Sequence, residues 1–207
     1  MLITLSAMCT SHASELVQVA GTTAKLLSEQ PDSSGDVWFS VKTTVRNSSS
    51  DYRYVSFTLQ GIDSDGFEMK SERFRGIVDP SSDMTFTDRT YMNGKNFDSI
   101  THWKVGMLKN KVTIEPRIKM LEAVSKSVSD VDSSGDIWYA VRASIQNLSD
   151  DTIQKVQIQG VDSDGFELCQ VTLDGSIEAG ETGSMTDKTY MAYKNFRRVT
   201  DWLLVRR

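Results

Sequence analysis

Apolar and polar residues alternate along two stretches of the chain, one starting at Ser33 and the other at Ser133. In the first stretch, apolar side chains and one threonine occupy every second position from Val37 to Val45. In the second, the same alternation runs from Ile137 to Ile145. A period of two with β-branched and aromatic residues indicates a β-strand that buries one face. Each stretch therefore predicts a half-buried strand.

The similarity between the two halves continues beyond these strands. Leu59–Met69 matches Ile158–Leu168, and Thr87–Trp103 matches Thr186–Trp202. Self-similarity on this scale, in a chain of 207 residues, predicts two domains of one fold built from an internal repeat. The predicted domains are residues 14–110 and residues 111–207.

Turn residues separate the predicted strands. Asp63–Gly66 and Asp162–Gly165 end in the Asp-Gly pair that suits a tight strand reversal. Strands separated by turns about every ten residues are typical of antiparallel β-sandwiches. Helical periodicity is weak, and Ala24–Gln30 and Lys119–Val128 allow at most a turn or two of helix each. The predicted fold class is therefore all-β, with two antiparallel β-sandwiches in series.

Asn47 and Asn147 end the two alternating strands and are expected to be turn residues. Each also begins an Asn-x-Ser sequence. Such a sequence accepts a glycan in a eukaryotic secretory pathway, whereas in a bacterial protein the two asparagines serve the turns alone.

The order of these motifs resembles a known family. In each half an alternating strand ends in Asn, and then "LQGID" at Leu59 or "IQGVD" at Ile158 leads into an Asp-Gly turn. This order is similar to that of FxLYD-type immunoglobulin-like domains, which occur in secreted and envelope proteins of bacteria. The match covers roughly two-thirds of each repeat, and both repeats have Gln-Gly where the naming motif has Leu-Tyr. The resemblance implies tandem immunoglobulin-like domains that act as a non-catalytic envelope module.

Composition and charge exclude two classes of protein. Apolar residues make up 39% of the chain and charged residues 25%, which is too apolar for a disordered protein. The formal net charge of -5 argues against nucleic-acid binding, which needs a basic face for the phosphates. No stretch approaches the ~18 apolar residues that a transmembrane helix needs.

Residues 1–13 form a short apolar stretch that ends in Ser11-His12-Ala13, an ending that signal peptidase accepts. Basic residues are missing before this stretch, which fits a clipped start; a buried first strand is the alternative. A signal peptide over residues 1–13 predicts a periplasmic or secreted protein. Cys169 would then be the only cysteine left, and we expect it to pack as a small buried hydrophobe.

Acidic turns are the candidates for a calcium site. Asp130 and Asp132 stand at alternate positions before Gly135, as at the start of a calcium loop, but position twelve is Val141 in place of Glu. The Asp-Ser-Asp-Gly turns offer two carboxylates each, too few for an ion that takes six to eight oxygens. The preference of Asp-Gly for tight hairpin turns explains these acidic residues without a metal ion, so we predict no cofactor. The candidate ligands are Asp63, Asp65, Asp130, Asp132, Asp162 and Asp164.

The sequence contains no Ser/His/Asp set and no phosphate-binding glycine loop. His102 has Asp201 as its counterpart in the second repeat. We therefore predict a protein without enzymatic activity.

Repeated aromatic and basic residues are the candidates for partner binding. Trp38 and Trp138 lie on the polar side of their strands, where tryptophan can anchor a partner. We expect a loop or the other domain to cover them instead. Trp103 and Trp202 are in phase with apolar neighbours and are expected in the core. The candidate partner-binding residues are Trp38, Trp138, Tyr91, Lys95, Tyr190 and Lys194.

The segments that contain Tyr91 and Tyr190 share the pattern Tyr-Met-x-x-Lys-Asn-Phe. A repeated recognition loop is one interpretation. The favoured one is a structural turn in which Tyr and Phe fill the end of the sandwich while Lys and Asn cap backbone groups.

The leading hypothesis is a non-catalytic exported protein that binds a protein partner or stabilises a larger envelope assembly. Exposed edge strands can pair with a partner strand, and tandem domains permit bivalent contact. The alternative is a calcium-stabilised adhesion module or carbohydrate-binding module. The oligomeric state stays open.

Overall fold

The computed structural model describes residues 2–3, 16–28 and 30–205, and the chain divides into two compact units. Unit 1 spans Met1–Glu115 and unit 2 spans Pro116–Arg206. The division thus falls between Glu115 and Pro116, within the segment Lys109–Arg117 where the repeat places the boundary. Each unit is all-β, with a short helix before its last strand.

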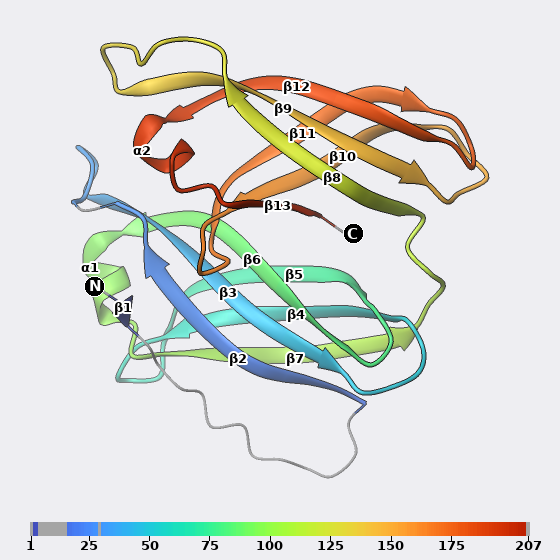
Figure 1. Cartoon of the computed structure of the whole chain (residues 1–207). Helices are drawn as coiled ribbons and strands as arrows, with labels where there is room; N and C mark the ends of the chain where they lie inside the picture. The colour runs from blue at the N-terminus through green and yellow to red at the C-terminus, as the bar shows by residue number, and fades with distance from the viewer. Residues whose placement is uncertain (1, 4–15, 29, 206–207) are drawn as a thin grey trace. The chain divides into compact units, whose positions relative to one another are not determined.

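Unit 1 is an antiparallel β-sandwich (Figure 1). One sheet has the strand order β1-β2-β3-β6 and the other has the order β5-β4-β7. The chain passes between the sheets after β3, after β5 and after β6, as in immunoglobulin-like folds. The elements are β1 (Leu2–Ile3), β2 (Val17–Leu26), β3 (Asp36–Asn47), β4 (Arg53–Ile62), β5 (Glu68–Val78), β6 (Ser82–Asn93), α1 (Gly94–Ser99) and β7 (His102–Val112).

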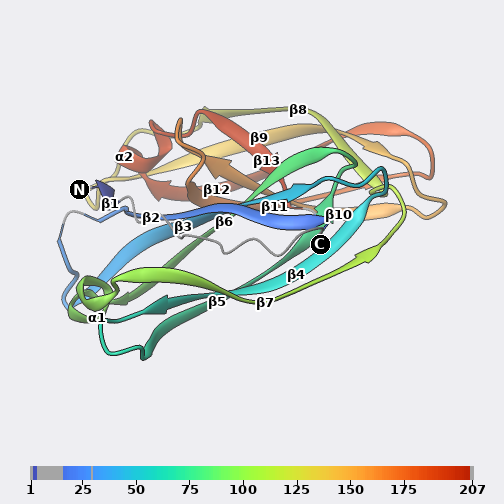
Figure 2. The same ribbon diagram turned by 90° about the horizontal axis from the view of Figure 1, so that it is seen from below.

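Unit 2 repeats the arrangement of β2 to β7, but its strands are joined differently. Its strand order is β13-β10-β11-β12-β9-β8, because the pair Asp174–Thr186 joins β11 to β12. Figure 2 shows the two sheets of unit 1 as separate layers, whereas the corresponding strands of unit 2 are linked into one sheet. The predicted class of two tandem immunoglobulin-like antiparallel β-sandwiches is confirmed. The elements are β8 (Ile118–Ser127), β9 (Asp136–Asn147), β10 (Ile153–Val161), β11 (Glu167–Ile177), β12 (Thr182–Ala192), α2 (Tyr193–Phe196) and β13 (Asp201–Leu204).

The core of each unit lies on the apolar side of its alternating strand. Phe39 on β3 is fully buried, and its ring centroid lies 4.8 Å from that of Phe97 and 6.1 Å from that of Trp103. In unit 2, Tyr139 on β9 has the same place beside Trp202, with 6.3 Å between the centroids. The two core tryptophans are each 6% exposed, which confirms their predicted burial.

A glycine on the neighbouring strand makes room for each core tryptophan. A Cβ atom added at Gly61 would lie 3.2 Å from two carbons of the Trp103 ring and 2.7 Å from Cδ1 of Ile100. At Gly160 it would lie 3.1 Å from the Trp202 ring and 2.9 Å from Sγ of Cys169. The glycine of each Gln-Gly pair is thus required because the indole ring packs directly on the backbone.

The two segments that allowed a helical turn contain strand instead. Ala24–Gln30 includes the end of β2, and Lys119–Val128 is almost wholly β8. Register shifts at Val19/Gly21 in β2 and at Met120/Glu122 in β8 interrupt the period of two, because a bulge moves the following residues to the other face. Sequence periodicity alone therefore missed these strands.

Leu2–Ile3 pairs with Ala24 and Lys25 of β2, whereas the rest of the predicted signal peptide, residues 1–13, lies outside the described residues. The helices of the described chain, α1 and α2, are both too short to cross a bilayer. Cys169 is 7% exposed and packs in the core of unit 2, so its expected burial as a small hydrophobe is confirmed.

Candidate functional site

An aromatic pair recurs at the same place in both units. The β3–β6 register sets Trp38 opposite Tyr91, and the β9–β12 register sets Trp138 opposite Tyr190. The ring centroids lie 5.1 Å apart at 51° in the first pair and 5.4 Å apart at 50° in the second. We call Trp38–Tyr91 pair 1 and Trp138–Tyr190 pair 2. Two pairs with one geometry point to a feature that was duplicated with the domain.

A cation lies over the tryptophan of each pair. The guanidinium carbon of Arg89 is 4.1 Å from the ring centroid of Trp38, and Nζ of Lys188 is 5.4 Å from that of Trp138. Both distances lie within the range of cation–π attraction. Arg89 and Lys188 each precede the paired tyrosine by two positions, so they share its face of the strand. This spacing was the signal in the sequence that could have identified them.

The pairs face outward. Tyr91 is 53% exposed, Tyr190 is 61% exposed and Trp138 is 45% exposed, while Trp38 is half-buried beneath Arg89. The expectation that a loop covers the tryptophans is wrong for Trp138 within its own unit, and the tyrosines do not fill the sandwich ends. The physical reason is the period of two, which sends Trp38 and Tyr91 away from the core that Phe39 enters. Cover by the other domain stays a prediction.

The other residues of the repeated Tyr-Met-x-x-Lys-Asn-Phe segment divide between helix and core. Phe97 is buried, and the Phe196 ring lies 5.1 Å from that of Tyr139, as the structural interpretation expected for the phenylalanines. The repeated Lys and Asn were expected to cap backbone groups. At the start of α1 the cap is instead Asn93, whose Oδ1 accepts the Lys95 backbone N–H at 3.1 Å. The side chains of Lys95 and Lys194 are exposed on α1 and α2.

The acidic turns use their first carboxylate to bind the turn itself. Oδ1 of Asp63 accepts the backbone N–H groups of Asp65 and Phe67 at 3.0 and 2.8 Å. Asp162 makes the same two contacts in unit 2, and its Oδ2 lies 3.0 Å from the Arg198 guanidinium. These bonds stabilise the hairpins that the Asp-Gly pairs predicted.

The candidate calcium loop is built in the same way. Oδ1 of Asp132 accepts the hydroxyl of Ser134 at 2.6 Å, the backbone N–H of Ser134 at 2.9 Å and that of Asp136 at 3.0 Å. These bonds, that from the Ser134 hydroxyl first, lower the pKa of the Asp132 carboxyl below its ordinary value. Asp65, Asp130 and Asp164 are exposed. Across the described ranges, no three His, Cys, Asp or Glu side chains gather closely enough to hold a metal ion.

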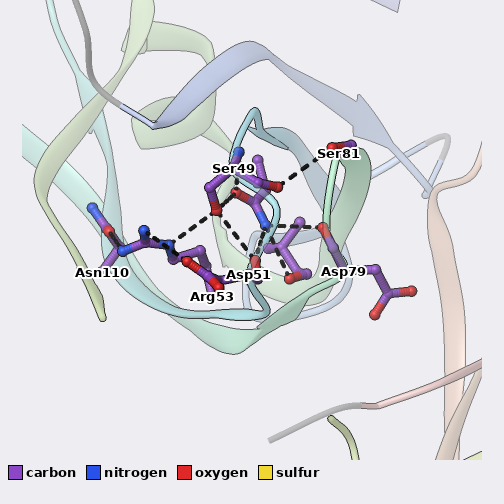
Figure 3. A network of polar contacts seen from close by, with 8 residues as sticks. Ser49, Asp51, Arg53, Asp79, Ser81 and Asn110 are labelled. Carbon is purple, nitrogen blue, oxygen red and sulfur yellow. Dashed lines mark hydrogen bonds and ion pairs between the residues drawn. The ribbon is translucent and has the colours of Figure 1, made fainter. Parts of the chain in front are cut away.

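Asn47 forms the centre of a buried polar network in unit 1. Figure 3 labels its partners Ser49, Asp51 and Asp79. Its Nδ2 donates to the carbonyl oxygens of Asp51 at 2.8 Å and Asp79 at 2.9 Å, and its Oδ1 accepts from the backbone N–H and the hydroxyl of Ser49. Arg53 in turn donates to the Ser49 hydroxyl at 3.1 Å. We call Asn47 and its partners the asparagine clamp. It ties the β3–β4 loop to the β5–β6 turn.

Unit 2 has the same clamp. Asn147 donates to the carbonyl oxygens of Asp151 at 2.8 Å and of Ile177 and Glu178 at 3.0 Å, and accepts from Ser149. Both asparagines are fully buried. The amide nitrogen that a glycan would occupy is thus already bonded inside the fold, so the interpretation as glycan acceptors is wrong for the folded domains.

Comparisons with known proteins add likenesses too distant to assign a family. No family model matches the chain, and no curated protein matches it. Among solved structures, a putative ApaA protein from Bordetella pertussis is 10% identical over 78% of this chain and 89% of its own, with a TM-score of 0.27. Red sea bream transglutaminase is 11% identical with a TM-score of 0.25, and the match covers 86% of this chain and 27% of the transglutaminase.

An exo-chitosanase from Amycolatopsis orientalis is 15% identical over 80% of this chain and 25% of its own, with a TM-score of 0.24. The chain thus spans about a quarter of the length of the two enzymes. All three TM-scores lie below one half, so these likenesses carry no argument about function. The resemblance to FxLYD-type domains stays a prediction, and the chain is characterised by its own geometry as two immunoglobulin-like β-sandwiches with duplicated, exposed aromatic pairs.

Proposed function

We propose that the chain is a non-catalytic protein that binds a protein partner through pair 1 and pair 2. The observation that carries this proposal is a Trp–Tyr pair, with a cation over the indole, at the same strand positions of both units. Both tyrosines and Trp138 are exposed, and Trp38 is half-buried. Tryptophan, tyrosine and arginine are enriched among the residues that dominate binding energy at protein interfaces. Duplication supplies two such contacts on one chain, which supports bivalent binding.

The chemistry of the pairs indicates what kind of surface fits them. Each pair offers a flat aromatic area beside a positive charge, Arg89 in unit 1 and Lys188 in unit 2. A protein surface with apolar side chains next to carboxylates would complement both features. An exported location, periplasmic or secreted, belongs to this proposal, as do kinship with FxLYD-type domains and a place in an envelope assembly. These three come from the sequence patterns alone.

Replacing Trp38 and Trp138 together with alanine is expected to weaken partner binding about 30-fold or more, since truncation of an interface hot spot costs at least about 2 kcal/mol. The free energy of unfolding is expected to fall by only about 1 kcal/mol per unit, the size of a cross-strand pair contribution. Affinity capture from the source cells with quantification of each captured protein measures binding, and chemical denaturation measures stability.

Phe67→Ala is the matched control, because Phe67 is an aromatic residue with 68% exposure outside both pairs. A protein captured equally by the wild type and this control, but lost with the double variant, supports the proposal. Capture of the same proteins in the same amounts by the double variant contradicts it. Unfolding of the double variant would show that the pairs serve the sheet rather than a partner.

The calcium-stabilised alternative predicts that calcium raises the melting temperature, whereas the proposed function predicts no change. We expect the melting temperature to be unchanged when millimolar calcium or a chelator is added, because Asp63, Asp132 and Asp162 already bind backbone N–H groups of their own turns. A ligand at 100 times its dissociation constant would stabilise the fold by about 2.7 kcal/mol. Calorimetry that shows a rise of several degrees with calcium would favour the alternative.

A further inference from the structure

The inward face of β5 in unit 1 turns polar at one end. Lys70 and Glu72 are in phase with the buried Phe74 and Val78, so their side chains enter the sandwich on the core side of the strand. Nζ of Lys70 lies 3.1 Å from Oε1 of Glu72, and the two side chains are only 24% and 18% exposed. A partly buried ion pair thus stands where the alternation would place apolar residues.

Asp88 completes the cluster from β6. It is in phase with the buried Phe86 and Met92, and on the β3 side its register partner is the apolar Val41. The charged groups that face its carboxyl are Glu72 and Lys70 of β5, and on its own strand the Arg89 backbone N–H donates to it. Burial first, and then the charge and hydrogen bond of Glu72, raise the pKa of Asp88 to about 7. Two carboxyl groups at one site retain one proton because both cannot ionise freely.

Unit 2 lacks this cluster, which makes it an internal control. A shift of 99 positions, as from Gly61 to Gly160, replaces Lys70 with Cys169 and Glu72 with Val171, both buried, while Asp187 takes the place of Asp88. In unit 2 Asp187 therefore has apolar residues at the positions of Lys70 and Glu72, whereas two carboxyl groups share a site in unit 1. A property that depends on the shared proton belongs to unit 1 alone.

Lys70 connects the cluster to pair 1. Besides its contact with Glu72, its Nζ donates to the backbone carbonyl oxygen of Tyr91 at 3.2 Å. Tyr91 is the residue whose ring packs on Trp38. The same ammonium group thus contacts the Glu72 carboxylate on one side and the backbone of the aromatic pair on the other.

We propose that Lys70, Glu72 and Asp88 form a proton-operated switch that controls the position of Tyr91 and hence the form of pair 1. When Asp88 is protonated it donates a hydrogen bond to Glu72, and Lys70 balances the single negative charge while it holds the Tyr91 carbonyl. When Asp88 loses its proton, a second carboxylate competes for the ammonium group and the bond to Tyr91 weakens. Pair 1 is then less rigidly held, while pair 2 is unaffected. The use of pair 1 as a regulated binding surface rests on the proposed function.

The direction of the effect on stability follows from the raised pKa. Folded unit 1 holds a proton on Asp88 that the unfolded chain releases near the ordinary pKa of 3.8. The stability contributed by this group is therefore fully present below pH 3.8 and falls as the pH rises toward 7, the folded-state value. Above pH 7 the contribution no longer changes.

The test follows the indole N–H signals of Trp38 and Trp138 by NMR between pH 5 and pH 9, in the full chain with its two histidines replaced by glutamine. We expect the Trp38 signal to shift with a midpoint near 7 and the Trp138 signal to stay constant in the same range. Asp88→Asn is expected to abolish the shift. Glu72→Gln is expected to lower the midpoint by at least about one pH unit, because the neighbouring negative charge is gone.

A second variant guards against loss of the fold. Lys70→Cys combined with Glu72→Val places the residues of unit 2 into unit 1, and replacement of an ion pair by apolar residues is often neutral for stability. It is expected to remove the pH dependence of the Trp38 signal, because the ammonium group that contacts the Tyr91 carbonyl is gone. The melting temperature is expected to keep its pH dependence, because Asp88 stays buried. A Trp38 signal that is constant with pH, or that still titrates in Asp88→Asn, overturns the switch. Neither readout uses a partner, so failure of partner binding in the Trp38 and Trp138 variants is a separate result.

Discussion

Replacing Asn47 with alanine is expected to lower the free energy of unfolding of unit 1 by about 3–4 kcal/mol. The substitution leaves the carbonyl oxygens of Asp51 and Asp79 without the amide that now donates to them, and it frees the Ser49 N–H and hydroxyl. Each buried polar group left unsatisfied costs about 1–3 kcal/mol. Chemical denaturation of the full chain, analysed as separate transitions for the two units, measures the loss.

Two variants serve as controls for the clamp. Asn147→Ala is expected to destabilise unit 2 by a similar amount, because its amide makes the same set of contacts. Ser48→Ala, an exposed position next to Asn47, is expected to change stability by no more than about 0.5 kcal/mol. A loss below about 1 kcal/mol in Asn47→Ala would show that the clamp contributes little to folding.

Trp202→Ala is expected to destabilise unit 2 by about 3–5 kcal/mol, the usual cost of truncating a buried large aromatic residue to alanine. Trp202 is 6% exposed, packs beside Tyr139 and lies directly on Gly160, so a cavity would open against rigid backbone. For a domain of this size the melting temperature of unit 2 should fall by more than about 12 °C. Trp103→Ala should have the same effect on unit 1.

The matched control is Trp138→Ala in the same unit. Trp138 is 45% exposed and contacts Tyr190 and Lys188, so its loss is expected to cost only about 1 kcal/mol. Equal destabilisation by Trp138→Ala and Trp202→Ala would mean that the outward aromatic pair is part of the folding core. A small effect of Trp202→Ala would contradict the packing of the indole on Gly160.

The strands that alternate without interruption were predictable from the sequence. In β3 and β9 the apolar residues from Val37 and from Ile137 onward are buried as the period of two requires. In β2 and β8 the alternation breaks at bulges. The end of β2 and nearly all of β8 were interpreted as helical. A bulge is a property of strand pairing, so the sequence of one strand does not reveal it.

The polar sites were not predictable in the same way. Asn47 and Asn147 read as turn residues, yet they hold two loops together through carbonyl groups as far away as Asp79 and Glu178. The cations over Trp38 and Trp138 lie on strands that pair with β3 and β9 from a distance along the chain. Lys70 and Glu72 belong to one strand and Asp88 to another, in a different sheet. These residues meet only when the strands are assembled.

By itself, the sequence determined the internal duplication, the all-β class, the buried face of each regular strand and the Asp-Gly hairpins, because each depends on neighbours a few residues apart. Only the tertiary structure decided that pair 1 and pair 2 are exposed, that the asparagines form clamps and that Glu72 shares a site with Asp88. The physical reason is that the side of a strand on which a residue lies is a local property with a period of two. The partner it finds there depends on strand order, register and crossovers between sheets, which arise from contacts across the whole fold.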